Sequence, residues 1–186
     1  MKRNISLVII VILFNVVWLY GINYTNSLFL TPEKEVVVDK TEKVEILDFE
    51  GISYKEIGEK IDKHLEKSSL KGKGKYIAKS AISKGVDPYL IASIIIINTG
   101  CDRVCNFKTT NCKNVGDLVG GKVTCYDGRY TKYDKYEDSI DDLVNYIYND
   151  FYSKEVKSPY DFYRSYGKTT NWAFKVNEKM EELRRS

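Results

Sequence analysis

The four cysteines of this chain lie in one short stretch, and a thiol cluster of this kind either forms disulfides or binds a metal. Cys101, Cys105, Cys112 and Cys125 are separated by three, six and twelve residues, and the other parts of the sequence contain no cysteine. Outside the cytoplasm this cluster predicts two disulfides, for which three pairings are open. The alternative is a four-cysteine zinc site, but only the first pair has the usual metal-ligand spacing. We therefore predict disulfides, with no metal and no cofactor.

The other residue types exclude several kinds of chemistry. His64 is the single histidine, and the sequence offers it no second partner for Ser-His-Asp or Cys-His catalysis. We interpret it as a helix-surface residue. Lys and Arg number 29 against 26 Asp and Glu, and a net charge of +3 is too small to indicate a nucleic-acid partner. The chain is rich in aromatic residues, with 15 Tyr, 7 Phe and 2 Trp. Aromatic faces stack on sugar rings, although we expect most of these side chains in the core.

These side chains must be positioned by helices, and the first helix signal lies at Ser53. The segment Ser53–Glu56 has the form of a capping box, in which a serine and a glutamate satisfy free backbone donors. Ile57, Ile61 and Leu65 follow at helical spacing and mark one apolar face. The sequence therefore predicts a helix that begins directly after Ser53.

Two more helices follow, and the second is apolar almost all round. One helix is predicted near Tyr76–Lys84, with Gly85 suited to a left-handed cap. Asp87-Pro88 then supplies an N-cap and a proline in the first turn, where its missing N–H costs nothing. Tyr89–Thr99 is so rich in isoleucine that it must be buried on all sides, and Gly100 ends it.

The cysteine-bearing stretch that follows is irregular and predicts one small hairpin. Val123–Tyr126 and Arg129–Lys132 flank Asp127-Gly128, which is a strong signal for a two-residue hairpin turn. Further helix starts are indicated at Asp134–Glu137, Ser158-Pro159 and Asn171. The predicted fold class is a mainly α domain over residues 53–186 with one small β-hairpin.

The N-terminus predicts a membrane anchor. Lys2 and Arg3 precede an apolar run over residues 5–22, which is close to the shortest length that crosses a bilayer. We expect residues 1–4 in the cytoplasm, 5–22 as a signal anchor or transmembrane helix, 23–52 as a linker, and an extracytoplasmic domain. The alternative is secretion after signal cleavage, although no A-x-A-like cleavage site follows the run.

An ordered series of short segments in the domain carries a family resemblance. The segments are Leu70-Lys71-Gly72-Lys73-Gly74-Lys75-Tyr76, Gly85-Val86-Asp87-Pro88-Tyr89-Leu90-Ile91-Ala92, Thr99-Gly100-Cys101, Cys112-Lys113-Asn114-Val115-Gly116, Tyr130-Thr131-Lys132-Tyr133 with Glu137 and Asp138, Tyr166, and Trp172-Ala173-Phe174-Lys175-Val176-Asn177. In this order they resemble the glucosaminidase branch of the lysozyme-like superfamily. These proteins are bacterial cell-wall hydrolases, also described as mannosyl-glycoprotein endo-β-N-acetylglucosaminidase-like.

The resemblance implies cleavage of β-1,4 glycosidic bonds in peptidoglycan, but the catalytic acid is replaced. The family's acid is the glutamate of a His-Glu-Thr/Ser-Gly motif at the end of the buried helix, and the matching residues here are Ile97-Asn98-Thr99-Gly100. Asn98 cannot deliver a proton near neutral pH, as glycoside cleavage requires. Asp117, where the family usually has another glycine, and Asp102 are the candidate substitutes for the missing carboxyl group.

The resemblance also implies a set of substrate-binding residues around the cleft. They are Asn98, Asn114, Tyr126, Tyr130 and Tyr166. The function expected from the sequence is a degenerate, glycan-binding protein of the cell envelope, with peptidoglycan glycan strands as its partner. One alternative is an active hydrolase that uses a displaced carboxylate. The other is a structural partner in a membrane complex that makes no contact with glycan.

Overall fold

The computed structural model describes residues 47–126 and 128–186 of the chain. The predicted anchor, residues 5–22, and most of the predicted linker lie outside these residues. Within the described ranges, no helix combines the length and the apolar character that crossing a membrane would require. The fold below is that of the compact unit that ends at Ser186.

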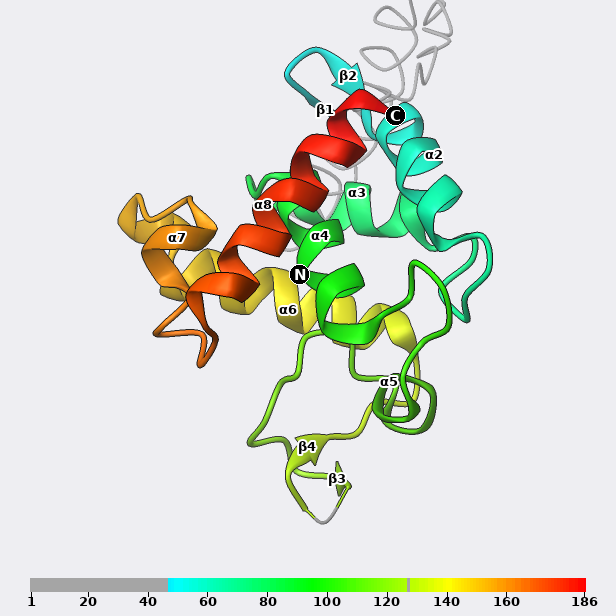
Figure 1. The fold of residues 1–186 in the computed structure, drawn as a ribbon, viewed down its shortest axis with the longest axis vertical. Coiled ribbons are helices and arrows are strands. Elements are labelled where there is room, and N and C mark those ends of the chain that lie inside the picture. The colour runs from blue at the N-terminus through cyan, green and yellow to red at the C-terminus, as the bar shows by residue number, and fades with distance from the viewer. Residues whose placement is uncertain (1–46, 127) are drawn as a thin grey trace, which may run out of the picture. The chain divides into compact units, whose positions relative to one another are not determined.

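The described chain is mainly helical, and its elements are labelled in Figure 1. The helices are α2 (Tyr54–Leu65), α3 (Gly74–Ser83), α4 (Pro88–Thr99), α5 (Phe107–Cys112), α6 (Tyr136–Asp150), α7 (Pro159–Phe162) and α8 (Thr170–Arg185), with a 3-10 turn, η1, at Tyr152–Lys154. The strands are β1 (Asp48–Phe49), β2 (Ile52–Ser53), β3 (Thr124–Cys125) and β4 (Tyr130–Thr131). The mainly α fold class predicted from the sequence is therefore confirmed.

Helix α4 forms the centre of the core, and both of its ends follow the signals in the sequence. Asp87 Oδ1 accepts a hydrogen bond from the Tyr89 backbone N–H at 2.8 Å, and Gly100 closes the helix with a left-handed φ of 69°. Every side chain from Leu90 to Ile96 is at most 1 % exposed. The helix packs against α3 and α8 (Figure 1), so its apolar surface is covered on all sides.

Helices α2 and α3 approach each other most closely at a pair of glycines. A Cβ atom on Gly74 would lie 2.2 Å from the Gly58 carbonyl oxygen, and one on Gly58 would lie 2.5 Å from the Lys75 Cα. No side chain fits in either place, because both obstacles are backbone atoms. Asp62 closes the contact by accepting a hydrogen bond from the Gly74 N–H at 2.8 Å.

A cluster of aromatic rings joins α6, α7 and α8 behind the end of α4. Phe151 stacks on Phe162 with ring centroids 4.6 Å apart, and Tyr166 lies 5.2 Å from Trp172 and 5.6 Å from Tyr146. Ring pairs at these separations gain contact energy beyond their burial. The cluster therefore fixes the positions of Tyr166 and Trp172.

The structure contains a hairpin that was predicted and one that was not. Thr124 pairs with Thr131 and Cys125 with Tyr130, so the predicted pairing of these two segments is present. The unpredicted hairpin, β1–β2, lies at the end of the segment predicted as linker. Its turn residues, Glu50 and Gly51, have positive φ angles of 55° and 78°, and a glutamate in this conformation gives no turn signal in a sequence.

The predicted start of α6 is wrong in its detail. Asp134 does not cap the helix; Lys135 occupies the N-cap position, and its side chain makes no cap hydrogen bond. Glu137, the last residue of the segment predicted to start this helix, accepts a hydrogen bond from Lys73 at the start of α3. This tertiary ion pair joins the start of α6 to α3.

The predicted cap of the last helix is also wrong, by two residues. Thr169, not Asn171, is the N-cap of α8, and its hydroxyl accepts the Trp172 backbone N–H at 3.2 Å. The predicted helix starts at Ser53 and Ser158 are confirmed, because the hydroxyls of these serines accept backbone N–H groups at the starts of α2 and α7.

Arg184, in the last turn of α8, holds the two ends of the domain together. Its guanidinium pairs with Glu50 in the β1–β2 turn at 2.9 Å and with Asp87 at the start of α4. It also lies 4.9 Å from the centroid of the Tyr89 ring. The C-terminus consequently lies beside the β1–β2 hairpin (Figure 1).

Candidate functional site

Asn98 lies in the last turn of α4, and both ends of its amide are engaged by side chains. Its Oδ1 accepts the indole N–H of Trp172 at 2.9 Å, and its Nδ2 donates to the hydroxyl of Tyr166 at 3.2 Å. Because an indole N–H only donates, the amide oxygen must face Trp172. The backbone carbonyl of Asn98 accepts from Asn106, which joins the end of α4 to α5.

Tyr166 connects Asn98 to the loop that follows α5. Its hydroxyl donates to the Gly116 carbonyl oxygen while it accepts from Asn98. Burial, with a smaller contribution from the charge of Asp117, raises the pKa of this hydroxyl well above its usual range. The group therefore stays protonated at neutral pH and works as a fixed donor.

Asn114, predicted to bind substrate, lies inside the loop rather than at its surface. Its side chain is fully buried, and its Nδ2 donates to the carbonyls of Leu118 and Thr131 at 2.8 and 2.9 Å. Its Oδ1 accepts the N–H groups of Gly116 and Leu118. The amide thus organises the loop around residue 117 and ties it to β4.

Asp117 is held between two lysines. Its Oδ1 pairs with Lys108 of α5, and its Oδ2 pairs with Lys168 at 2.7 Å. The three side chains are only 16–21 % exposed. Asp117 has a positive φ of 57°, a backbone conformation that glycine adopts readily. Both oxygens of Asp117 are therefore occupied by ion pairs with lysine ammonium groups.

The sequence analysis did not identify Lys108 or Lys168 as members of the site. Lys108 lies nine residues before Asp117 and Lys168 lies fifty-one residues after it. No helical or strand period relates these positions. The sequence indicated Asp117 only because the resembled family usually has glycine at this position. That difference pointed to the carboxylate but not to the two lysines that pair with it.

A pocket of about 290 Å³ opens beside the ion-paired carboxylate. It is lined by Gly116, Asp117, Val119, Arg129, Tyr130, Tyr166, Gly167 and Lys168. Asp102, the other candidate carboxylate, lies elsewhere: it is exposed and lines a second pocket together with His64 and side chains of α2 and α8. The structure thus brings Asp117, Tyr130 and Tyr166 together and places Asp102 in a different group.

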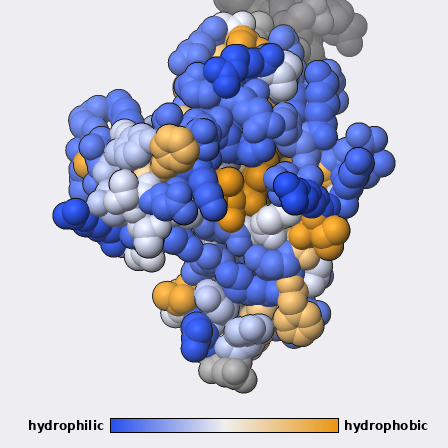
Figure 2. Space-filling view, viewed as in Figure 1, coloured by the Kyte–Doolittle hydropathy of each residue, from blue (hydrophilic) through white to orange (hydrophobic). Residues whose placement is uncertain are grey.

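Three aromatic rings extend from this pocket along the surface, and we call them the aromatic row: Phe107, Tyr126 and Tyr130. Their centroids are 6.3 Å apart from the first ring to the second and 6.1 Å from the second to the third. Phe107 is 69 % exposed and Tyr126 is 51 % exposed. Lys108 Nζ lies 4.6 Å from the centroid of the Tyr130 ring. Figure 2 shows apolar side chains at the surface in the region of α5.

The four cysteines form the disulfides Cys101–Cys105 and Cys112–Cys125. All four sulfurs are used, which excludes the alternative of a four-cysteine zinc site. Cys112–Cys125 links α5, which carries Phe107, to the β3–β4 hairpin, which carries Tyr126 and Tyr130. Disulfides are typical of proteins in an oxidising, extracytoplasmic compartment.

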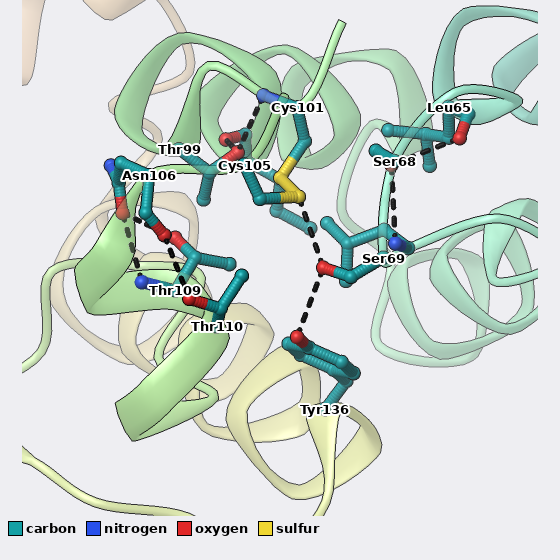
Figure 3. Close-up of a disulfide and its surroundings, with 12 residues drawn as sticks. Leu65, Ser68, Ser69, Thr99, Cys101, Cys105, Asn106, Thr109, Thr110 and Tyr136 are labelled. Carbon is teal, nitrogen blue, oxygen red and sulfur yellow. Dashed lines mark hydrogen bonds between the residues drawn. A yellow bond between two sulfur atoms is a disulfide. The ribbon is translucent and has the colours of Figure 1, made fainter. Parts of the chain in front are cut away.

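The Cys101–Cys105 disulfide, which closes the shorter loop, is held by contacts with neighbouring segments (Figure 3). The Ser69 hydroxyl contacts Cys105 Sγ at 3.1 Å and accepts the hydroxyl of Tyr136, in the first turn of α6, at 3.0 Å. The backbone N–H of Cys101 in turn donates to Thr99 Oγ1. These contacts fix the turn between α4 and α5 and therefore the direction in which α5 leaves the core.

The pocket is lined by a phenol and an ion-paired carboxylate, and aromatic faces continue it along the surface. Asn98 itself is not part of the pocket lining and is joined to it through Tyr166. No protein-family model matches the chain, and no curated protein matches it either.

Proposed function

We propose that this protein is a cell-envelope protein that binds the glycan strands of peptidoglycan without cleaving them. It would be a degenerate member of the lysozyme-like glucosaminidase family, held at the membrane by residues 5–22. The observation that carries the proposal is the amide of Asn98, which takes the place of the family's catalytic acid and is engaged by Trp172 and Tyr166.

The chemistry of the pocket supports binding over cleavage. Protonation of the leaving oxygen by a carboxylic acid contributes about 10²–10⁴-fold to a hydrolysis rate. Asn98 has no such proton, and both oxygens of Asp117 are occupied by lysine ammonium groups. Asp102 belongs to another pocket. None of the three residues therefore offers an unpaired carboxyl group in this pocket.

The surface beside the pocket supports a sugar as the ligand. Pyranose rings have apolar faces made of C–H groups, and these pack on exposed aromatic rings, while their hydroxyls need polar partners. The aromatic row supplies the rings, and the pocket supplies polar side chains such as Asp117, Arg129 and Lys168. The two disulfides support an extracytoplasmic location, where peptidoglycan is found.

The test uses the full-length chain in detergent, incubated with insoluble peptidoglycan. We expect the protein to pellet with the polymer and to release no reducing ends. Tyr130→Ala removes the ring where the row meets the pocket, and we expect it to weaken binding about fivefold or more, because a ring contact contributes about 1 kcal/mol. Tyr160→Ala is the matched control, since Tyr160 is exposed on α7, outside the aromatic row.

Two outcomes would overturn the proposal. Release of reducing ends by the wild-type chain, abolished by Asp117→Asn, would establish a hydrolase that uses a displaced carboxylate. Failure of the wild-type chain to pellet would instead favour a structural partner in a membrane complex that does not contact glycan.

A further inference from the structure

The pocket beside Asp117 contains more positive than negative charge. Lys168 and Arg129 line it, and Lys108 reaches the same carboxylate from α5. Among the described residues of this group, three cationic side chains accompany one carboxylate, which leaves two positive charges in excess. A neutral sugar would not need this excess, whereas an anionic one would be attracted by it.

The two lysines are held in place before any ligand binds. Lys108 and Lys168 side chains are 16 % and 21 % exposed, and Asp117 fixes both ammonium groups. A lysine ammonium has three N–H donors, and one from each lysine is used by Asp117. The remaining donors are already ordered, so an anion that binds there loses little of the usual side-chain entropy.

The position of this charge next to the aromatic row defines the kind of ligand. Lys108 Nζ lies over the Tyr130 ring, and the same ring lines the pocket. A sugar stacked on Tyr130 therefore brings its ring substituents within reach of the lysines. A carboxylate on a short substituent would meet the ammonium groups while the ring keeps its stacking contact.

We propose that the site selects glycan strands whose sugars carry free carboxylates. In peptidoglycan, the lactyl carboxyl group of muramic acid is free only where the stem peptide is absent, because the peptide is joined to it as an amide. The inference rests on the proposed function and specifies its substrate class: glycan strands from which an amide-cleaving reaction has removed the peptides.

The experiment measures binding of the full-length chain to three soluble probes. The first is peptide-free glycan strands, the second is the same strands with their carboxyl groups converted to neutral amides, and the third is a polyglycerol phosphate. We expect the first probe to bind about tenfold more tightly than the second at low salt, since charge-assisted hydrogen bonds are about twice as strong as neutral ones. The preference should shrink in high salt, which screens partly exposed charges.

Variants of Lys168 connect the preference to the pocket. Lys168→Gln should reduce the preference for free carboxylates several-fold, and Lys168→Arg, which keeps the charge, should retain it. Lys157→Gln is the matched control: Lys157 is also ion-paired, with Glu155, but it is 57 % exposed and does not line this pocket. Circular dichroism of each variant checks that the fold is retained.

The results separate this inference from the proposed function. Equal binding of the free and amidated strands would overturn the inference and leave glycan binding in place. Equal or tighter binding of the polyglycerol phosphate would also overturn it, because the site would then select charge without the sugar. Failure of all three probes to bind would overturn the proposed function itself.

Discussion

At the scale of single residues, the site is defined by which protons its side chains can supply. The Asn98 amide has none to give near neutral pH, and Trp172 and Tyr166 hold it in place at the end of α4. The neighbouring phenol keeps its proton because burial raises its pKa. What remains is a set of fixed donors and acceptors, which is what recognition of a polar ligand requires.

A carboxyl group restored at position 98 provides the sharpest test of this interpretation. We expect Asn98→Glu to release reducing ends from peptidoglycan about 10²-fold above the background seen with the wild type, because it places a general acid at the end of α4. Asn98→Gln is the matched control, with the same chain length and no acidic proton, and it should stay at the wild-type level. Equal rates for the two variants would show that the acid position lies elsewhere.

The ion pair of Glu137 with Lys73 makes a second residue-scale prediction, about pH. The hydrogen bond from Lys73 lowers the pKa of Glu137 below its ordinary value of 4.5. A carboxyl group whose pKa is lowered by folding stabilises the fold above its unfolded pKa, and this contribution is lost as the pH falls through the folded value. Glu137→Gln should therefore lower the Tm near neutral pH.

The difference in Tm between the wild type and Glu137→Gln should then close as the pH falls through the lowered pKa of Glu137, below which both side chains are neutral. Thermal unfolding followed by circular dichroism measures it. Glu59→Gln serves as the control, since Glu59 pairs with Lys75 but is 63 % exposed, and exposed pairs contribute little. A difference that grows as the pH falls would contradict a stabilising ion pair between Glu137 and Lys73.

At the scale of elements, local signals located the helices well and failed where tertiary contacts took over. Asp87 and Gly100 act within one helical turn, so they bounded α4 in the sequence and in the structure. Glu137 has its partner sixty-four residues away, and no local pattern announces such a pair.

The same difference explains how much of the site could be predicted. Asn98 was singled out by the family resemblance, but nothing in the sequence indicated its contact with Trp172, which reaches it from seventy-four residues further along the chain. Asn114 was expected at the surface of the cleft, whereas the structure uses its amide inside the loop. Contacts of this kind depend on packing, which the order of residues alone does not reveal.

The glycine contact between α2 and α3 gives a prediction at the scale of elements. Gly74→Ala would place a methyl group 2.2 Å from a backbone oxygen, and the helices must move apart to admit it. We expect a loss of about 1–3 kcal/mol in the free energy of unfolding, which is typical of overpacking. Lys79→Ala, an exposed position of the same helix, should change the stability by less than about 0.5 kcal/mol. Denaturant titration measures both values.

At the scale of the whole molecule, both disulfides lie within the least regular part of the chain, between residues 101 and 125. Cys112–Cys125 joins residues thirteen apart in the chain, and Cys101–Cys105 joins residues four apart. Because the entropy lost by the unfolded chain grows with loop length, the longer loop should contribute more stability. It also connects the elements of the aromatic row, so it bears on binding as well.

Removing each disulfide separately tests this assignment. The double variant Cys112→Ser/Cys125→Ser should lose about 3 kcal/mol of stability and most of its glycan binding, because β3 is then free to leave α5. Cys101→Ser/Cys105→Ser should lose about 2 kcal/mol and retain more of the binding. Pelleting with peptidoglycan, at a temperature where both variants are folded, distinguishes the two roles. Equal binding by the two variants would show that the link to the hairpin does not position the site.

The contact between Arg184 and Glu50 marks one end of the domain. Figure 1 places β1, β2 and the C-terminal end of α8 at one end of its long axis, and α5 with the β3–β4 hairpin toward the other. The described chain begins at β1, so it enters the domain at the Arg184 end, away from the aromatic row. A ligand that lies along the aromatic row would therefore be held far from the point where the chain enters the domain.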